Sequence, residues 1–161
     1  MHENRILIHK LKNFENINSN FLIITLMLFG SILLAISAKV QVPFWPVPMT
    51  MQTFVIFLIG MTYSVRLSFA TVAFYLFQGA IGLPVFAAGG GVAYLVGPTA
   101  GYLYGMLFAS IVISYLANLG FSKTYFKATV SLLIGSAIIF SFGIIYLGYI
   151  IGFEKAVAAG L

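Results

Sequence analysis

The side chains that could take part in chemistry are neutral hydrogen-bonding groups, gathered in a few stretches of the chain. They are Thr50, Gln52, Thr53, Tyr75, Gln78, Thr99, Tyr102 and Tyr104. Amides, hydroxyls and phenols donate and accept hydrogen bonds without carrying a charge, so together they suit a neutral polar ligand such as an amide or ureido group. Each also has a plainer interpretation, because Thr can bond its own helix backbone and Tyr is common at interfaces. Their clustering favours ligand binding.

Most catalytic and metal-binding chemistry is excluded by the residue types that the chain lacks. There is no acidic residue between Glu15 and Glu154, and there is no Cys. Paired carboxylates, Asp-rich Mg²⁺ or Ca²⁺ sites and thiol chemistry are therefore excluded. The two histidines, His2 and His9, lie in the polar N-terminal segment, where two ligands without a third rarely form a metal site. We predict no catalytic residue, no metal site and no cofactor.

Transmembrane helices must position the polar groups, because 61% of the residues are hydrophobic and only 7% are charged. A soluble domain carries about a quarter charged residues. An α-helix needs roughly 20 apolar residues to cross the hydrocarbon core. Five segments meet this requirement approximately, and they cover residues 20–38, 50–65, 67–83, 99–119 and 129–152. We predict an all-α membrane protein with one transmembrane domain over residues 20–161, in which the second and third spans form a hairpin that turns at Arg66.

The basic residues predict the orientation in the membrane. Six of them flank the spans on one side, namely Arg5, Lys10, Lys12, Arg66, Lys123 and Lys127. Only Lys39 and Lys155 fall on the other side. The positive-inside rule then places the basic N-terminal tail, residues 1–19, in the cytoplasm. We expect a multi-pass protein of the plasma (inner) membrane. The charges form no basic stripe, so no nucleic-acid partner is predicted, and the apolar run of the first span exceeds that of a cleaved signal peptide.

Two loops between spans are expected on the outer side. Residues 39–50 contain three prolines, which favour a stiff, extended loop. Trp45 in this loop is either an interfacial anchor or a stacking surface for a ligand.

The second outer loop, residues 84–98, is apolar but too rich in glycine for a continuous helix. Non-helical backbone at this depth persists only against protein or a water-filled cavity. Gly89, Gly90 and Gly91 could place bare backbone against a small molecule, with Tyr94 nearby, although a flexible connector is the alternative.

Rows of small residues predict close helix contacts, because helices in lipid associate through such faces. The clearest row is Gly97, Gly101, Gly105 and Ala109. Further small residues are Ser31, Ala35 and Ala38 in the first span, and Ser131, Gly135, Gly148 and Gly152 in the last. Each row indicates either packing inside the bundle or docking of a partner membrane protein.

Three motifs occur in a fixed order and spacing. They are Val47-Pro48-Met49-Thr50-Met51-Gln52-Thr53, Tyr75-Leu76-Phe77-Gln78-Gly79-Ala80-Ile81-Gly82-Leu83-Pro84-Val85-Phe86 and Gly97-Pro98-Thr99-Ala100-Gly101-Tyr102-Leu103. From about Ala35 to Leu161 the chain resembles the BioY family of biotin transporters. The resemblance implies a substrate-binding S component of an energy-coupling factor transporter, a six-helix bundle that captures biotin on the outer side and is energised by a coupling transmembrane protein and two ATPase subunits.

The resemblance turns the candidate residues into an expected site. The ligand-binding candidates are Trp45, Gln52, Tyr75, Gln78, Gly89, Gly90, Gly91, Tyr94, Thr99 and Tyr102, and the candidates for docking the coupling protein are Ser31, Ala35 and Ala38. The chain has no G-x-x-x-x-G-K-[ST] phosphate loop with which to hydrolyse ATP itself. The family continues past a stretch like residues 152–161 into a Pro-Gly-Asp, a lysine and a sixth helix. This chain stops at Leu161, so five of six helices are expected; a non-binding remnant or half of a split transporter is the alternative.

Overall fold

The computed structural model describes residues 19–43 and 47–160. Nearly all of the basic N-terminal tail, and Trp45 in the first outer loop, lie outside the described residues. The described chain is mostly helical. Its elements are α2 (Ser19–Lys39), β1 (Gln41–Val42), β2 (Met49–Thr50), α3 (Gln52–Thr62), α4 (Val65–Ala80), α5 (Val92–Leu95), α6 (Ala100–Asn118), the 3₁₀ turn η1 (Phe121–Lys123), α7 (Tyr125–Ile151) and α8 (Phe153–Gly160).

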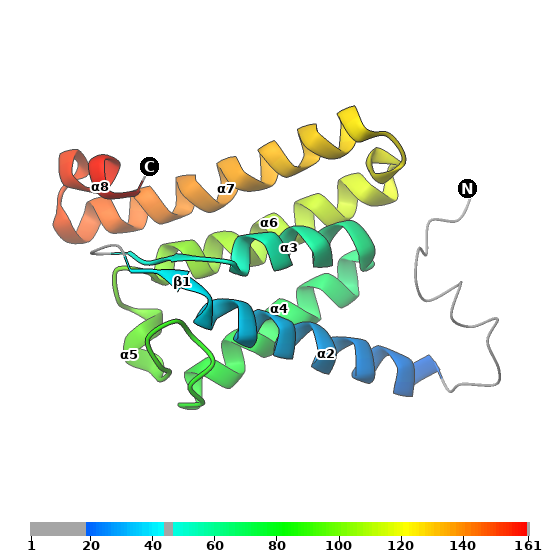
Figure 1. Ribbon diagram of the computed structural model, residues 1–161, viewed down its shortest axis with the longest axis horizontal. Coiled ribbons are helices and arrows are strands. Elements are labelled where there is room, and N and C mark those ends of the chain that lie inside the picture. Colours follow the sequence, from blue (N-terminus) through cyan, green and yellow to red (C-terminus); the bar gives the residue numbers. More distant parts are fainter. Residues whose placement is uncertain (1–18, 44–46, 161) are drawn as a thin grey trace.

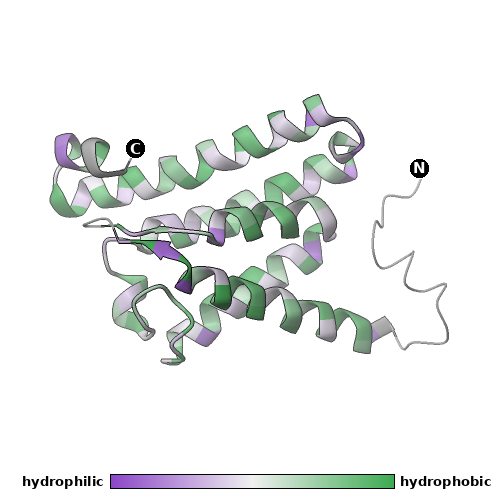
Figure 2. Ribbon diagram, in the orientation of Figure 1, coloured by the Kyte–Doolittle hydropathy of each residue, from purple (hydrophilic) through white to green (hydrophobic). Residues whose placement is uncertain are grey.

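The five predicted spans correspond to α2, α3, α4, α6 and α7, so the all-α fold class is confirmed. Among the described residues, three helices are long and apolar enough to cross a membrane, namely α2, α6 and α7. The other two are shorter, with 11 residues in α3 and 16 in α4. Figure 2 shows apolar residues along the length of the helices and hydrophilic ones mainly at their ends. The number of membrane crossings and the side of the N-terminus stay predictions.

The predicted turn between the second and third spans was misplaced. Tyr63 and Ser64 have extended backbone, with ψ of 154° and 157°, and they separate α3 from α4. The Ser64 hydroxyl accepts a hydrogen bond from the backbone N–H of Leu67 at 3.4 Å, which caps the new helix. Arg66 therefore lies in the first turn of α4 and not in the connection.

The connections gather at two opposite ends of the bundle. One end carries the β1–β2 hairpin, the connection from α4 through α5 to α6, and α8 (Figure 1). The other end carries the start of α2, the α3–α4 turn and the α6–α7 turn. The hairpin pairs Gln41 with Thr50 and Val42 with Met49, so the two ends of the loop that was predicted to be stiff lie side by side.

Helices α6 and α7 pack almost backbone to backbone. A Cβ atom placed on Gly101 would lie 2.4 Å from Cβ of Tyr146, and one on Gly105 would lie 2.9 Å from Cα of Ile139. Gly101 and Gly105 of the predicted small-residue row therefore pack inside the bundle, as one of the two interpretations expected. Gly97, the first residue of that row, lies in the connection before α6.

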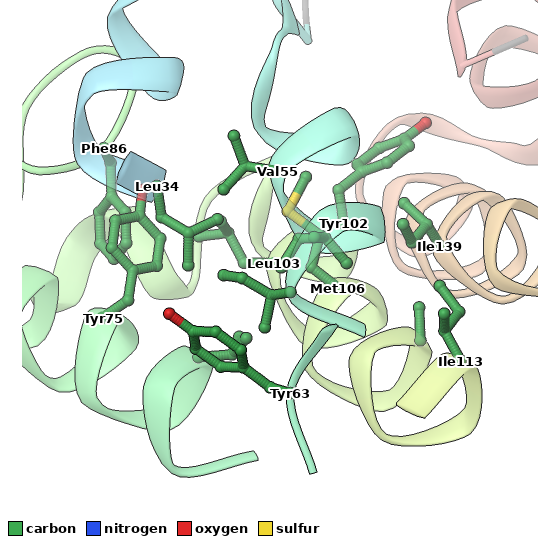
Figure 3. Packing of buried hydrophobic residues seen from close by; sticks show 14 of the residues in the cluster. Leu34, Val55, Tyr63, Tyr75, Phe86, Tyr102, Leu103, Met106, Ile113 and Ile139 are labelled. Carbon is green, nitrogen blue, oxygen red and sulfur yellow. The ribbon is translucent and has the colours of Figure 1, made fainter. Parts of the chain in front are cut away.

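The main hydrophobic core joins α2, α3, α4, α6 and α7. Figure 3 shows Leu34 of α2 and Val55 of α3 near Leu103 and Met106 of α6, with the Tyr75 and Phe86 rings at one edge. The core therefore extends to the end of the bundle where the predicted outer loops lie.

Candidate ligand-binding site

A continuous chain of polar side chains joins the first loop, α3, α4 and the second loop. The Thr50 hydroxyl donates to Oε1 of Gln52 at 3.0 Å, and Nε2 of Gln52 donates to the Tyr75 hydroxyl at 2.7 Å. The Tyr75 hydroxyl in turn donates to the backbone oxygen of Val85 at 2.9 Å. Gln52 and Tyr75 are both buried. A buried polar group is costly unless it is bonded, so this chain of bonds fixes the relative position of its four elements.

The position of Gln52 follows from the hairpin. It is the first residue of α3 and comes directly after Met51, whose backbone N–H donates to the oxygen of Val40 at 3.0 Å. The hairpin thus fixes the start of α3 beside the end of α2, and the Gln52 side chain points inward to Tyr75 on α4.

A second link joins α2 to α4. The Ser31 hydroxyl donates to Oε1 of Gln78 at 2.9 Å, with Ser31 buried and Gln78 half-buried. An amide that accepts one bond at Oε1 retains two N–H donors for another partner. The predicted site residues Gln52, Tyr75 and Gln78 therefore lie at one end of the bundle, on α3 and one face of α4.

The centre of this region is Phe86, which the sequence analysis did not single out. Its ring stacks on Tyr94 with centroids 4.9 Å apart and meets the Tyr75 ring edge-on at 5.4 Å. The ring is fully buried and lies on Gly79, where a Cβ would come within 1.9 Å of Cζ of Phe86. Figure 3 shows Phe86 directly against Tyr75. The signals for this role were its place in the glycine-rich loop, where Tyr94 is the other aromatic residue, and at the end of the second motif.

The part of the second loop that contains Gly89, Gly90 and Gly91, the glycine loop, has a defined conformation. The backbone N–H of Phe86 donates to the oxygen of Gly89 at 2.8 Å, and the reverse bond is 3.3 Å. Gly89 and Gly91 have φ of 132° and 106°, values that residues with a Cβ rarely adopt. The N–H of Gly91 donates to the oxygen of Gly79 at 2.7 Å, and a Cβ on Gly90 would lie 2.0 Å from the oxygen of Leu83. Glycine is required here because the loop folds tightly onto α4.

Two predicted site residues lie elsewhere. The Tyr102 ring packs on α7, where a Cβ on Gly143 would lie 2.3 Å from it, and it meets Phe140 edge-on at 6.4 Å. Thr99 is half-buried at the start of α6, and its backbone oxygen accepts from Tyr102 and Leu103. Both residues stay candidates for ligand binding.

Comparison with known proteins identifies the family. The profile of the BioY family matches residues 10–161. The chain belongs to the BioY family. It is 35% identical over 144 residues to "Probable biotin transporter BioY" of Rickettsia prowazekii (strain Madrid E), covering 89% of this chain and 74% of the relative. It is 38% identical over 130 residues to "Biotin transporter BioY" of Thermotoga maritima, covering 80% of this chain and 76% of the relative.

A solved structure has the same fold as this BioY-family chain. It is described as "Crystal structure at 2.1 A of the S-component for biotin from an ECF-type ABC transporter", with a TM-score of 0.79 and 24% sequence identity. The match covers 91% of this chain and 82% of that chain. The chain is therefore a multi-pass membrane protein of the plasma membrane with the S-component fold.

The predicted docking residues on α2 differ in exposure. Ser31 and Ala38 are buried against the other helices of this BioY-family chain, whereas Ala35 is half-exposed. Their docking role stays a prediction. In the part of the chain that the structure describes, there is no group of three His, Cys, Asp or Glu residues that could hold a metal ion.

Proposed function

We propose that this chain is the biotin-binding membrane subunit of a biotin uptake system, energised by a separate ATPase module. Membership of the BioY family carries the proposal, together with two relatives that are named as biotin transporters. The shared fold with an S component for biotin supports the same assignment.

The chemistry of the candidate site suits biotin. Biotin has a neutral ureido ring, an apolar thioether ring and a carboxylate on a short alkyl chain. The ureido group needs neutral donors and acceptors, which Gln52, Tyr75 and Gln78 supply. The apolar ring needs an apolar, polarisable wall, which Phe86 and Tyr94 supply beside the polar chain.

The glycine-rich second loop supplies a further part of the proposed site. Gly89, Gly90 and Gly91 place backbone without side chains next to Phe86. The hydrogen bonds between Phe86 and Gly89 hold that backbone in one conformation. Trp45 in the first loop, Thr99 at the N-cap of α6 and Tyr102 on α6 are further candidates.

Transport against a gradient requires energy. The sequence contains no phosphate-binding loop motif for ATP hydrolysis, so we expect other subunits to supply that energy. A coupling transmembrane protein and ATPase subunits are the partners that the S-component assignment calls for. Of the three proposed docking positions, Ala35 is the accessible one, and it lies on α2 between the exposed Ile32 and Ile36. A small residue between two large apolar ones suits close approach of another helix.

The test is equilibrium binding of labelled biotin to the 161-residue chain in nanodiscs, with unlabelled biotin as competitor. Gln52→Met keeps the approximate shape and removes the amide, and we expect it to weaken binding about tenfold or more, as loss of a buried hydrogen-bonding group does. Thr62→Ala is the matched control, because Thr62 lies at the other end of α3 and bonds Leu58 of its own helix. Its affinity should equal that of the parent. A folded, monodisperse parent that shows no saturable, competable binding would refute the proposal.

A further inference from the structure

Among residues 19–43 and 47–160, one cation reaches the aromatic cluster of the site. Lys39 is the last residue of α2, and its Nζ donates to the backbone oxygen of Phe86 at 2.6 Å. The bond joins positions 47 residues apart in the chain. Figure 1 places the end of α2 at the same end of the bundle as the hairpin and α5.

The acceptor for the Lys39 ammonium group is a neutral backbone carbonyl and not a carboxylate. Glu154 is the single acidic residue in the described part of the chain, and it lies on α8. A carboxylate is a stronger acceptor for an ammonium group than a neutral carbonyl is, because it also brings an opposite charge. Lys39 would therefore exchange its carbonyl acceptor for a carboxylate that arrived at the same place.

Two plainer roles explain only part of this geometry. A lysine at the C-terminus of a helix is favoured by the helix dipole, and an interfacial lysine extends its ammonium group toward water. Both account for a charge at this position. Neither requires the ammonium group to turn onto the carbonyl of Phe86, whose ring is fully buried between Tyr75 and Tyr94.

We propose that Lys39 recognises the carboxylate of the bound ligand, an inference that rests on the proposed biotin-binding function. Neutral amides and a phenol meet the neutral ureido end, aromatic rings meet the apolar middle, and Lys39 meets the anionic end. The ligand carboxylate takes the place of the Phe86 carbonyl on Nζ, so binding also releases one of the bonds that tie the glycine loop to α2. The residue thereby selects for an acid over its neutral analogues.

The test compares the affinities of biotin and biotinamide, which differ at the carboxylate, for the whole chain in nanodiscs. We expect the parent to bind biotin about tenfold more tightly than biotinamide, the value of one charge-assisted bond. Lys39→Met should weaken biotin binding and leave biotinamide binding nearly unchanged, so that the preference falls to about one. Lys39→Arg should retain the preference. Lys155→Met is the matched control, because Lys155 is an exposed lysine on α8, and it should retain the preference too.

The outcomes separate this inference from the function on which it rests. If the parent binds both ligands equally, or if Lys39→Met keeps the parent's preference, Lys39 does not read the carboxylate, although biotin binding stands. If folded Lys39→Met loses affinity for both ligands to the same extent, its role is structural and the inference is wrong. If the parent binds neither ligand, the proposed function itself fails. Should Lys39→Met not purify as a monodisperse protein, Lys39→Gln supplies the same comparison.

Discussion

Replacing Gly79 by Ala tests whether the Phe86 ring is held where the site needs it. The added Cβ would lie 1.9 Å, 2.2 Å and 2.6 Å from Cζ, Cε2 and Cε1 of Phe86. Carbon atoms pack at about 3.5–4.0 Å, so the ring must retreat by about 2 Å. That movement disturbs the stack on Tyr94, the edge contact with Tyr75 and the Lys39 bond to the Phe86 oxygen.

The size of the effect follows from two opposing contributions. Ala is a better helix former than Gly by about 1 kcal/mol, while overpacking a well-packed site costs about 1–3 kcal/mol. A clash at 1.9 Å places the overpacking cost in the upper part of this range, at about 2–3 kcal/mol, so the net destabilisation of Gly79→Ala should be about 1–2 kcal/mol. This lowers the apparent melting temperature by roughly 2–8 °C for a chain of this size. Affinity for biotin should fall at least severalfold, because the displaced ring occupies part of the proposed site.

A second substitution tests the contact between Gly79 and the Phe86 ring directly. Phe86→Leu shortens the side chain that the new Cβ would meet, so Gly79→Ala should cost clearly less in that background than in the parent. Thermal scans in detergent and biotin titrations on the four proteins of the cycle measure the coupling between the two positions. An equal cost of Gly79→Ala in both backgrounds would mean that the ring does not pack on Gly79, and the structure of the site described above would be wrong.

Two further predictions use pairs of chemically identical changes at different places. Tyr75→Phe removes the donor to Val85 and the acceptor for Gln52, so it should weaken biotin binding about tenfold. Tyr63→Phe removes a hydrogen bond to Leu26 at the other end of the bundle, so it should lower the free energy of unfolding by about 1 kcal/mol without changing the affinity. Equal effects of the two variants on affinity would contradict the assignment of the site. Gly101→Ala should destabilise the chain by about 1–3 kcal/mol, because the new Cβ would clash with the backbone of Phe142 and the side chain of Tyr146. Gly97→Ala should be nearly neutral, because its new Cβ would make only ordinary van der Waals contacts. Thermal scans compare the two variants, and similar melting temperatures would argue against the close α6–α7 contact.

The helices were predictable from sequence because lipid requires long apolar segments, and that signal does not depend on tertiary contacts. The connections were less predictable. The α3–α4 turn was placed at Arg66, since charge marks a helix end in hydropathy, but the Ser64 cap and two extended residues set the turn earlier. The separate helix α8 was not expected, because its apolar residues continue those of α7; Gly152, with φ of 90°, ends α7.

The candidate site was predicted in part. Gln52, Tyr75 and Gln78 were identified because polar side chains in apolar helices need partners, and the structure brings them to one end of the bundle. Tyr102 carries the same signal but turns to α7, since Gly143 leaves room for its ring there. Phe86 was missed, because hydropathy cannot distinguish a buried aromatic ring from one facing lipid. Only the fold of the glycine loop onto Gly79 brings it inside.

The glycine-lined contact between α6 and α7 has a mechanical consequence. Helices that meet through long side chains can slide past each other as those side chains change rotamer, but backbone against backbone offers no rotamers to change. α6 and α7 should therefore move together as one rigid unit. The side chains proposed to meet the ureido ring lie on α3 and α4, and the glycine loop folds back onto α4. Any conformational change on ligand binding should then occur as these elements shift relative to the α6–α7 unit. Spin labels on α6 and α7 should keep a constant separation, while labels on α4 should move relative to them.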